Sequence, residues 1–525
     1  MDNPLVLLDY GILVLFAISM VVIAVITRNR SKSVNDFLLA GKKGLNGWMS
    51  AFSYGTTYFS AVIFIGYAGN FGRQYGLASA WIGIANAIVG ALFAWLVLAK
   101  RTKNMTSALN SKTMPDFFEK RYDSKNIKLI SAIVVFLFLI PYSASVYNGL
   151  SSLFEAVFGI PGWVICLILA GLTALYLFFG GYFATSVSDF VQGIIMLVGV
   201  VVMVILFMNN DPVNWDLSQL TSNPELNWFT FGSSNTGLYG NTMSLISLIL
   251  LTSFGVWALP QTVHKYYAIR DKKAIMQGTV VSTAFALIIG FLAYFVGSLS
   301  TIFVNAGMID GNLAGDQIIP AMLSFRQIIP NGVIGLIAVL ILSASMSTLA
   351  SVSLASASVV AVDIYKDRIK KDATDKQVNI VMKALCLVFV AISVIIAILN
   401  NKFKIAAIAY LMGISWGTLA GCFMGPFVLG LLWKRTTKKG AWASIISSLV
   451  LTVSLVIFFG YHKYYQENGI MCSFGEAIKT GVSVSPMIGV ICMIFSIIIT
   501  VVVSLMTKPP KEETIKKAFE KKVIE

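Results

Sequence analysis

Long apolar stretches recur along nearly the whole chain, and they limit its possible folds more than any other feature. Thirteen of them are long enough to cross a bilayer as an α-helix, which takes about 17–25 residues. We therefore predict an all-α polytopic membrane protein, with its termini on opposite sides because the number of spans is odd. The expected spans are 5–26, 47–70, 78–99, 128–157, 163–180, 184–208, 242–264, 276–303, 332–364, 379–399, 405–433, 441–461 and 485–506.

The basic residues are concentrated in alternate loops between these spans. Of the 39 Lys and Arg residues, 32 fall in segments that would share one side of the membrane. Because loops rich in Lys and Arg stay in the cytoplasm, we expect the N-terminus outside, the C-terminus inside and the protein in the cell membrane. The net charge of +15 then reflects topology. We expect lipid around the helices, no nucleic-acid partner and no required protein partner.

No residue pattern typical of an enzyme is present in the sequence. His264 and His462 have no acid or cysteine at catalytic spacing, and there is no phosphate-binding loop. The five cysteines lack metal-ligand spacing, so neither a zinc site nor a disulfide framework is expected. We predict that the chain is not an enzyme.

Two predicted spans carry residues that favour a break near the middle of the membrane. The span 47–70 contains SYGTTYFS, and the span 242–264 contains GVWALPQ, whose proline removes a backbone donor and frees a carbonyl. Each is the first of five spans, an arrangement typical of inverted repeats whose broken helices bind ions and substrate. A simple kink, with hydroxyls bonded back to their own helix, is the alternative.

The span 332–364 carries eight hydroxyl side chains and no charge between Ile341 and Ser358. This small, oxygen-bearing surface favours either close packing against another helix or the binding of a hard cation such as Na⁺. In a helix, four residues spaced i, i+3, i+4 and i+7 share one face: Ala344, Ser347, Thr348 and Ser351.

Asp189 lies near the start of the span 184–208. An ionisable side chain within a span is a candidate functional group because burying its charge is costly. It would act as a cation ligand or a gate, unless it stays hydrated near the inner surface or caps a helix. Lys265 is assigned to the following inner loop, 265–273, so no Lys or Arg is expected at mid-depth. A carboxylate substrate would then be held by hydroxyls, amides or freed backbone N–H groups.

Three motifs spaced along the chain carry a family resemblance. They are GGYFATSVSDFVQG, MSTLASVS followed by DIYKD, and LLWKRTTKKGAWAS. Together they resemble the sodium:solute symporter family, which includes carriers of proline, pantothenate, monocarboxylates, glucose and sialic acid. The resemblance implies a LeuT-type fold of two inverted five-helix repeats with one extra helix before and two after. The expected segments are 1–46 (first helix and inner loop), 47–208 (repeat one), 209–241 (outer loop), 242–433 (repeat two), 434–506 (two further helices) and 507–525 (cytoplasmic tail).

The resemblance also implies a Na⁺ site between the first helix of repeat one and the serine-rich span. Three of its ligands belong to the shared face derived above, and this agreement favours Na⁺ binding over packing. Carried over by motif, the ligands are the backbone carbonyls of Thr56, Phe59 and Ala344 and the hydroxyls of Ser347 and Thr348.

Some family members hold a second Na⁺ deeper in the membrane, through an acid and hydroxyls. Here Asp189, Ser347 and Ser351 match that set, but Ala350 replaces a serine, so the sequence leaves a second ion open.

The resemblance implies uptake of a small organic solute driven by Na⁺. The expected solute is an amino acid such as proline, or a small carboxylate such as pantothenate or a monocarboxylate. Tyr58 stands where the proline carriers have an acid, and the fourth span lacks the arginine of the sialic acid carriers. A sensor or channel on the same scaffold, or a sugar or sialic acid symporter, is the alternative. The candidate substrate contacts, for whose aromatic members ordinary packing is the alternative, are Thr57, Tyr58, Tyr142, Trp257, Pro260 and Gln261.

Overall fold

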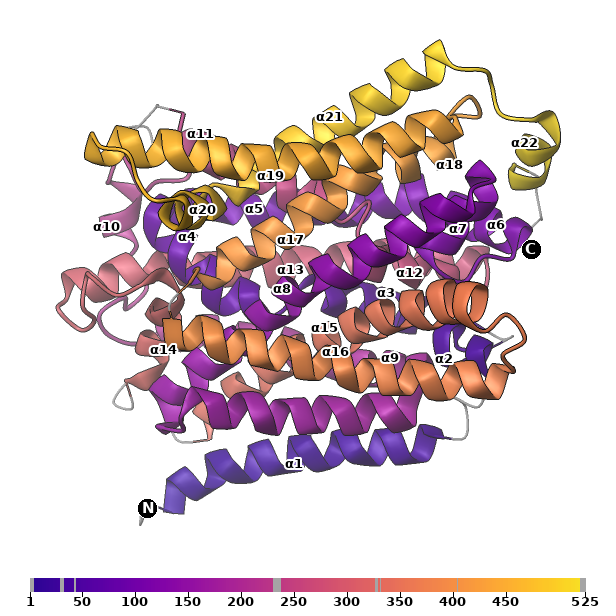
Figure 1. Cartoon of the computed structure of the whole chain (residues 1–525). Coiled ribbons are helices and arrows are strands. Elements are labelled where there is room, and N and C mark those ends of the chain that lie inside the picture. Colours follow the sequence, from indigo (N-terminus) through magenta and orange to yellow (C-terminus); the bar gives the residue numbers. More distant parts are fainter. Residues whose placement is uncertain are drawn as a thin grey trace.

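The structure is a computed structural model that describes residues 4–28, 33–41, 44–229, 238–325, 329–330, 332–403 and 405–519. Its long helices run roughly parallel to one another (Figure 1). The start of α1 lies at one end of the bundle, and α22 lies at the other end. The basic residues Lys42 and Lys43, most of RNRSKS, part of the outer loop and the end of the tail lie outside the described residues. Among the described residues no strand is present, only an isolated bridge between Leu45 and Ile269.

The helices follow the predicted spans closely. The first half of the chain contains α1 (Pro4–Thr27), α2 (Val34–Leu39), α3 (Gly47–Tyr58), α4 (Ala68–Tyr75), α5 (Ala80–Ala85), α6 (Lys100–Leu109), α7 (Met114–Tyr122), α8 (Lys125–Phe158), α9 (Gly162–Met208) and α10 (Ser218–Thr221), with π-helical stretches at Val62–Tyr67, Asn86–Phe93 and Trp95–Ala99 and a 3₁₀ turn at Gly76–Ser79. The second half contains α11 (Asn241–Gly255), α12 (Pro260–Tyr267), α13 (Lys272–Asn305), α14 (Gly315–Ser324), α15 (Val333–Ser358), α16 (Asp375–Phe403), α17 (Ile408–Phe423), α18 (Gly430–Leu432), α19 (Lys438–Asn468), α20 (Phe474–Ser483), α21 (Ser485–Met506) and α22 (Glu512–Ala518), with π-helical stretches at Val359–Ile369 and Met424–Leu429.

Eleven helical segments in the described part of the chain are long and apolar enough to span a membrane. The expected count of thirteen is therefore not confirmed. The difference arises where predicted neighbours are continuous in the structure, because Val62–Leu109 and Gly162–Met208 each run through parts of two predicted spans. Within the second of these, Gly181 adopts φ 58° and ψ −167°, a backbone conformation essentially restricted to glycine, and the chain turns there.

Both predicted helix breaks are present. Helix α3 ends at Tyr58, and Phe59 is extended with φ −108° and ψ 123° before helical structure resumes. Helix α11 ends at Gly255, and α12 begins at Pro260 after the extended residue Leu259. These irregular segments lie inside the protein, where neighbouring helices can satisfy the freed backbone groups.

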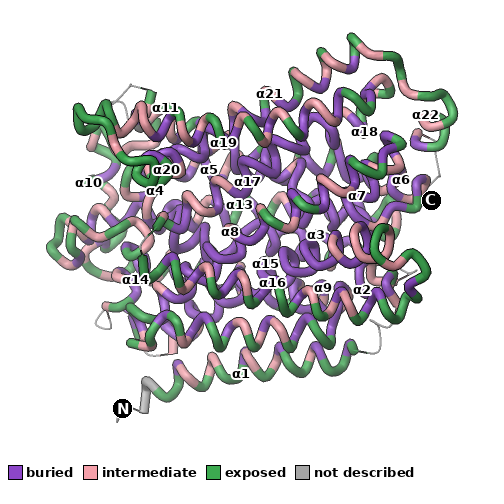
Figure 2. The backbone as a smooth tube through the Cα atoms, in the orientation of Figure 1, coloured by how far each residue is buried: buried purple, intermediate pink, exposed green. Residues whose placement is uncertain are grey.

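Burial places α15 and α17 at the centre of the bundle. In the most apolar 18-residue stretch of each of the segments Val333–Ile369 and Ile408–Leu432, 89% is buried, against 22% in that of α1. Figure 2 shows the same contrast between the interior and the edge of the bundle. Large apolar side chains on α1, such as Leu15 and Ile26, are exposed, as expected of a surface that faces lipid. The carboxylate of Asp9 ties α1 to the N-terminus of α15, where it accepts from the backbone N–H groups of Gly332 and Gly335, each at 2.8 Å.

Two short helices, α10 and α14, lie between predicted spans, in the segments 209–241 and 304–331. The charged tail forms α22, which packs against α6 and α7 instead of standing free. Phe519, just after α22, lies beneath the guanidinium of Arg121 at 5.3 Å.

Candidate functional site

The serine-rich helix α15 meets the broken end of α3. The Oγ1 atom of Thr348 lies 3.1 Å from the carbonyl oxygen of Ala344 in its own helix. It also lies 3.4 Å from the carbonyl oxygens of Thr56 and Thr57 in the last turn of α3. Four oxygen atoms from two helices thus converge, which is the kind of ligand that a hard cation prefers.

A second hydroxyl of α15 extends this group of oxygens. Ser347 Oγ lies 2.8 Å from the hydroxyl of Thr56 and 2.6 Å from Oδ1 of Asp189 in α9. Two residues earlier, Ser345 accepts the backbone N–H of Ala61 at 3.2 Å, so α15 also satisfies a backbone donor freed by the break in α3. All these side chains are buried.

The structure therefore brings together four of the five residues predicted to bind the first Na⁺: Thr56, Ala344, Ser347 and Thr348. The fifth, Phe59, is the extended residue that ends α3. Its ring packs on those of Tyr58 and Phe285. The residues present fit a Na⁺ ion in type, because carbonyl and hydroxyl oxygens dominate the group.

Asp189 is fully buried in the interior of α9, which contradicts the alternative that it stays hydrated or caps a helix. Its Oδ2 atom accepts a hydrogen bond from Ser53 at 2.5 Å and lies 3.6 Å from Nζ of Lys265. The assignment of Lys265 to an inner loop is also wrong, because this residue lies in α12 and is 2% exposed. No periodic pattern in the sequence indicates that a lysine at the end of an apolar block lies inside the protein.

Ser351 links this ion pair to the break in α3. Its Oγ lies 2.8 Å from Nζ of Lys265 and 2.9 Å from the hydroxyl of Thr57. Asp189 and Ser351, two of the three residues that match the set for a second Na⁺, therefore both contact the ammonium group of Lys265.

Three of the six predicted substrate contacts are aromatic, and their surroundings differ. Tyr58 and Tyr142 are both buried and pack against Trp416, with ring centroids 6.2 Å and 5.6 Å from the indole. The hydroxyl of Tyr58 donates to the carbonyl of Thr252 in α11 at 2.7 Å. By contrast, the half-buried indole of Trp257 donates to the carbonyl of Val89 at 3.0 Å, a contact that packs α11 against its neighbour.

Pro260 and Gln261 begin α12, and no side chain caps this helix end. Gln261 is buried, and among the described residues its Oε1 atom has no hydrogen-bond partner. The same is true of the hydroxyl of Tyr142 and the indole N–H of Trp416. These groups offer a donor and acceptors to a small polar solute.

Trp416 was missed by the sequence reasoning. It lies in α17, is 1% exposed and comes within 4.0 Å of the position that a side chain at Gly255 would occupy, beside the second break. No break or charge marks its span, so the sequence carried no signal for it.

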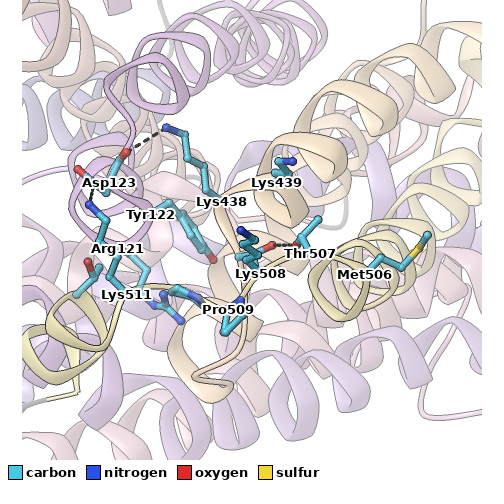
Figure 3. A pocket seen from close by; sticks show the side chains of 13 residues that line it. Arg121, Tyr122, Asp123, Lys438, Lys439, Met506, Thr507, Lys508, Pro509 and Lys511 are labelled. Atoms are coloured by element: carbon cyan, nitrogen blue, oxygen red, sulfur yellow. Dashed lines mark hydrogen bonds and ion pairs between the residues drawn. The ribbon is translucent and has the colours of Figure 1, made fainter.

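A separate cavity of about 540 Å³ opens between α7, the start of α19 and the chain after α21 (Figure 3). Its lining is strongly basic, and Lys438 and Lys511 approach Asp123 across it. None of the oxygens described above lines this cavity, so it is not part of the candidate ion site.

Comparison with known proteins places this geometry in a family. The model of the sodium:solute symporter family matches residues 37–447. The chain belongs to the sodium:solute symporter family. It is thus an integral membrane transport protein of a family that couples solute movement to Na⁺.

Two curated relatives of this symporter match along most of its length. The osmoregulated proline transporter OpuE of Bacillus subtilis is 27% identical over 477 residues, which cover 90% of this chain and 93% of that protein. A sodium/proline symporter of Staphylococcus aureus is 27% identical over 517 residues, covering 95% of this chain and 93% of that protein.

Solved structures agree on the fold. A Na⁺-coupled sialic acid symporter in a substrate-bound, outward-open state superimposes with a TM-score of 0.76 at 18% identity, covering 96% of this chain and 99% of the other. A nucleobase-cation-symport-1 family transporter gives a TM-score of 0.51 at 13% identity, with 93% and 98% covered. The symporter therefore has the LeuT-type fold.

Proposed function

We propose that this symporter takes up a small organic solute, with proline as the favoured solute, by coupling its entry to the inward movement of Na⁺. The observation that carries this proposal is the meeting of α15 with the broken end of α3. There the hydroxyls of Ser347 and Thr348 lie against the hydroxyl and the carbonyl oxygen of Thr56. A Na⁺ ion bound by these oxygens would join the two helices on which the solute site depends.

Coupling follows from shared structure. Na⁺ would hold the last turn of α3 in place, and Tyr58, the final residue of that turn, is one of the candidate solute contacts. Solute and ion therefore favour the same arrangement, with a coupling free energy of about 1–3 kcal/mol. The membrane potential adds about 2.3 kcal/mol per charge per 100 mV to inward movement. Repeats at 47–208 and 242–433 would rock against each other to expose the site alternately.

Proline fits the groups around the second break. At the uncapped N-terminus of α12, Pro260 has no N–H, and Thr262 and Val263 donate theirs to the carbonyl of Leu259. Gln261 supplies the backbone N–H that suits a carboxylate. The aromatic rings of Tyr58, Tyr142 and Trp416 suit a compact apolar ring that carries a positive charge on its nitrogen. The two relatives named above are proline transporters, which supports the same solute.

Two features of the site leave small carboxylates among the solutes to be tested. Tyr58 replaces the acid of the proline carriers, so the amine would be held by aromatic rings without a carboxylate. Lys265, the buried lysine closest to the second break in sequence, is already engaged by Asp189 and Ser351. A solute carboxylate would therefore depend on backbone donors.

The test is uptake into proteoliposomes with and without an inward Na⁺ gradient. Proline, pantothenate, a short monocarboxylate and a sugar would be compared at equal concentration. We expect Na⁺-dependent accumulation of proline, increased by an inside-negative potential. Accumulation that is indifferent to Na⁺ for every solute would overturn the coupling. Na⁺-dependent accumulation of another solute alone would retain the coupling and replace proline.

A further inference from the structure

The ammonium group of Lys265 is enclosed by groups that suit a cation. Its Nζ lies 2.8 Å from Ser351 Oγ, 2.9 Å from Ser53 Oγ and 3.6 Å from Oδ2 of Asp189. The ring of Tyr182 faces it at 5.1 Å, with the favourable geometry of a cation above an aromatic face. Four helices, α3, α9, α12 and α15, thus meet at one positive charge.

The oxygens that would bind a second Na⁺ are already used. Asp189 Oδ1 accepts from Ser347, and its Oδ2 faces both Ser53 and the ammonium. Ser351 Oγ contacts the ammonium and the hydroxyl of Thr57. A Na⁺ ion between Asp189 and Ser351 would have to displace Lys265 from both.

The charges of this network also argue against a second Na⁺. The network contains one carboxylate and one ammonium, and within the described residues no second carboxylate contacts it. An additional Na⁺ would leave a buried excess of positive charge a few ångströms from an ammonium. Buried charges are tolerated when they are paired, and here the pairing is complete with Lys265 in place.

We propose that the ammonium of Lys265 replaces a second Na⁺ ion, so that this symporter binds a single Na⁺ per transport cycle. The tethered cation performs the structural task of an ion by joining four helices, but it remains with the protein and carries no charge across the membrane. Ala350, which lacks the hydroxyl of the matching serine, agrees with a position that has no metal ion to coordinate. This inference rests on the proposed function for its first Na⁺ site.

The experiment counts Na⁺ ions bound to the purified full-length chain in nanodiscs, with ²²Na⁺ and without added solute. The wild type should bind one Na⁺ per chain with a Hill coefficient of 1. A Lys265→Ala, Ala350→Ser variant, which removes the ammonium and restores the hydroxyl, should bind two and show a Hill coefficient above 1. Ala350→Ser alone is the matched control, and it should still bind one because the ammonium remains.

Two results would overturn the inference: two Na⁺ ions bound by the wild type, or a single ion bound by a monodisperse double variant. Should the double variant fail to fold, the reversal potential of wild-type uptake decides instead. One Na⁺ per solute supports the inference, and two contradict it. A wild type that binds no Na⁺ would overturn the proposed function as well. Counting needs no solute, so an error in the choice of proline leaves this result unaffected.

Discussion

Ser347 donates a hydrogen bond to Asp189 at 2.6 Å, although 158 residues separate them in the chain. Its hydroxyl also contacts Thr56, so a single small side chain connects α15 to both α3 and α9. Binding or release of an ion beside Thr56 would therefore act on the buried pair of Asp189 and Lys265 through the Oγ atom of Ser347. This arrangement makes the hydroxyls of α15 the most informative positions for mutation.

Removal of either candidate Na⁺-binding hydroxyl should weaken Na⁺ binding. Ser347→Ala and Thr348→Ala each remove one oxygen ligand, and we expect the Na⁺ concentration for half-maximal proline uptake to rise about tenfold, or about 1.4 kcal/mol. Ser358→Ala is the matched control, because within the described part of the chain this hydroxyl on the same helix bonds only to the carbonyl of Ala355. Equal Na⁺ dependence in all three variants would remove these hydroxyls from the site.

The hydroxyl of Tyr58 should matter for solute affinity. Tyr58→Phe removes the hydrogen bond to the Thr252 carbonyl that holds the ring beside Trp416. Loss of about 1 kcal/mol would raise the half-saturating proline concentration about fivefold. Tyr461→Phe, on the peripheral helix α19, is the control. An unchanged half-saturation in Tyr58→Phe would mean that the ring only packs.

Much of the fold was accessible from the sequence because the bilayer imposes it. Apolar length alone located the spans, and Pro260 together with the polar run before Phe59 located the two breaks. Where two spans follow each other without a polar loop, hydropathy carries no information about continuity. For this reason, the sequence predicted two spans, 163–180 and 184–208, where the structure has one run, Gly162–Met208. The predicted boundary does fall at the turn of Gly181.

The site was predictable only where one helix supplies several of its residues. Helical spacing grouped Ser347 with Thr348, but it could not reveal that Lys265 reaches Ser351 across 86 residues. Trp416 was likewise invisible, because an aromatic residue in an apolar span looks the same whether it faces lipid, core or solute. Contacts between helices depend on how helices pack, which periodicity within one helix does not contain.

The turn within α9 should depend on Gly181. At φ 58° and ψ −167° a side chain is strained, so Gly181→Ala should destabilise the folded protein by about 1–3 kcal/mol. Gly171→Ala in the same helix is the control, because an added Cβ there meets no atom within 4 Å. The apparent melting temperature in detergent measures both. Equal melting temperatures would show that the chain can turn without this conformation.

The buried pair of Asp189 and Lys265 should be stable only when both charges are present. Asp189→Asn or Lys265→Met leaves one charge unpaired at a position that is at most 2% exposed, and such a loss costs about 3–5 kcal/mol. The double variant Asp189→Asn, Lys265→Met removes both charges, so its apparent melting temperature in detergent should exceed that of at least one single variant. Lys366→Met is the control for an ordinary ion pair, because Lys366 and its partner Asp375 are partly exposed and such pairs contribute about 0–1 kcal/mol. A double variant whose loss equals the sum of the two single losses would show that the charges do not stabilise each other, and the ammonium would then lack the role of a bound cation.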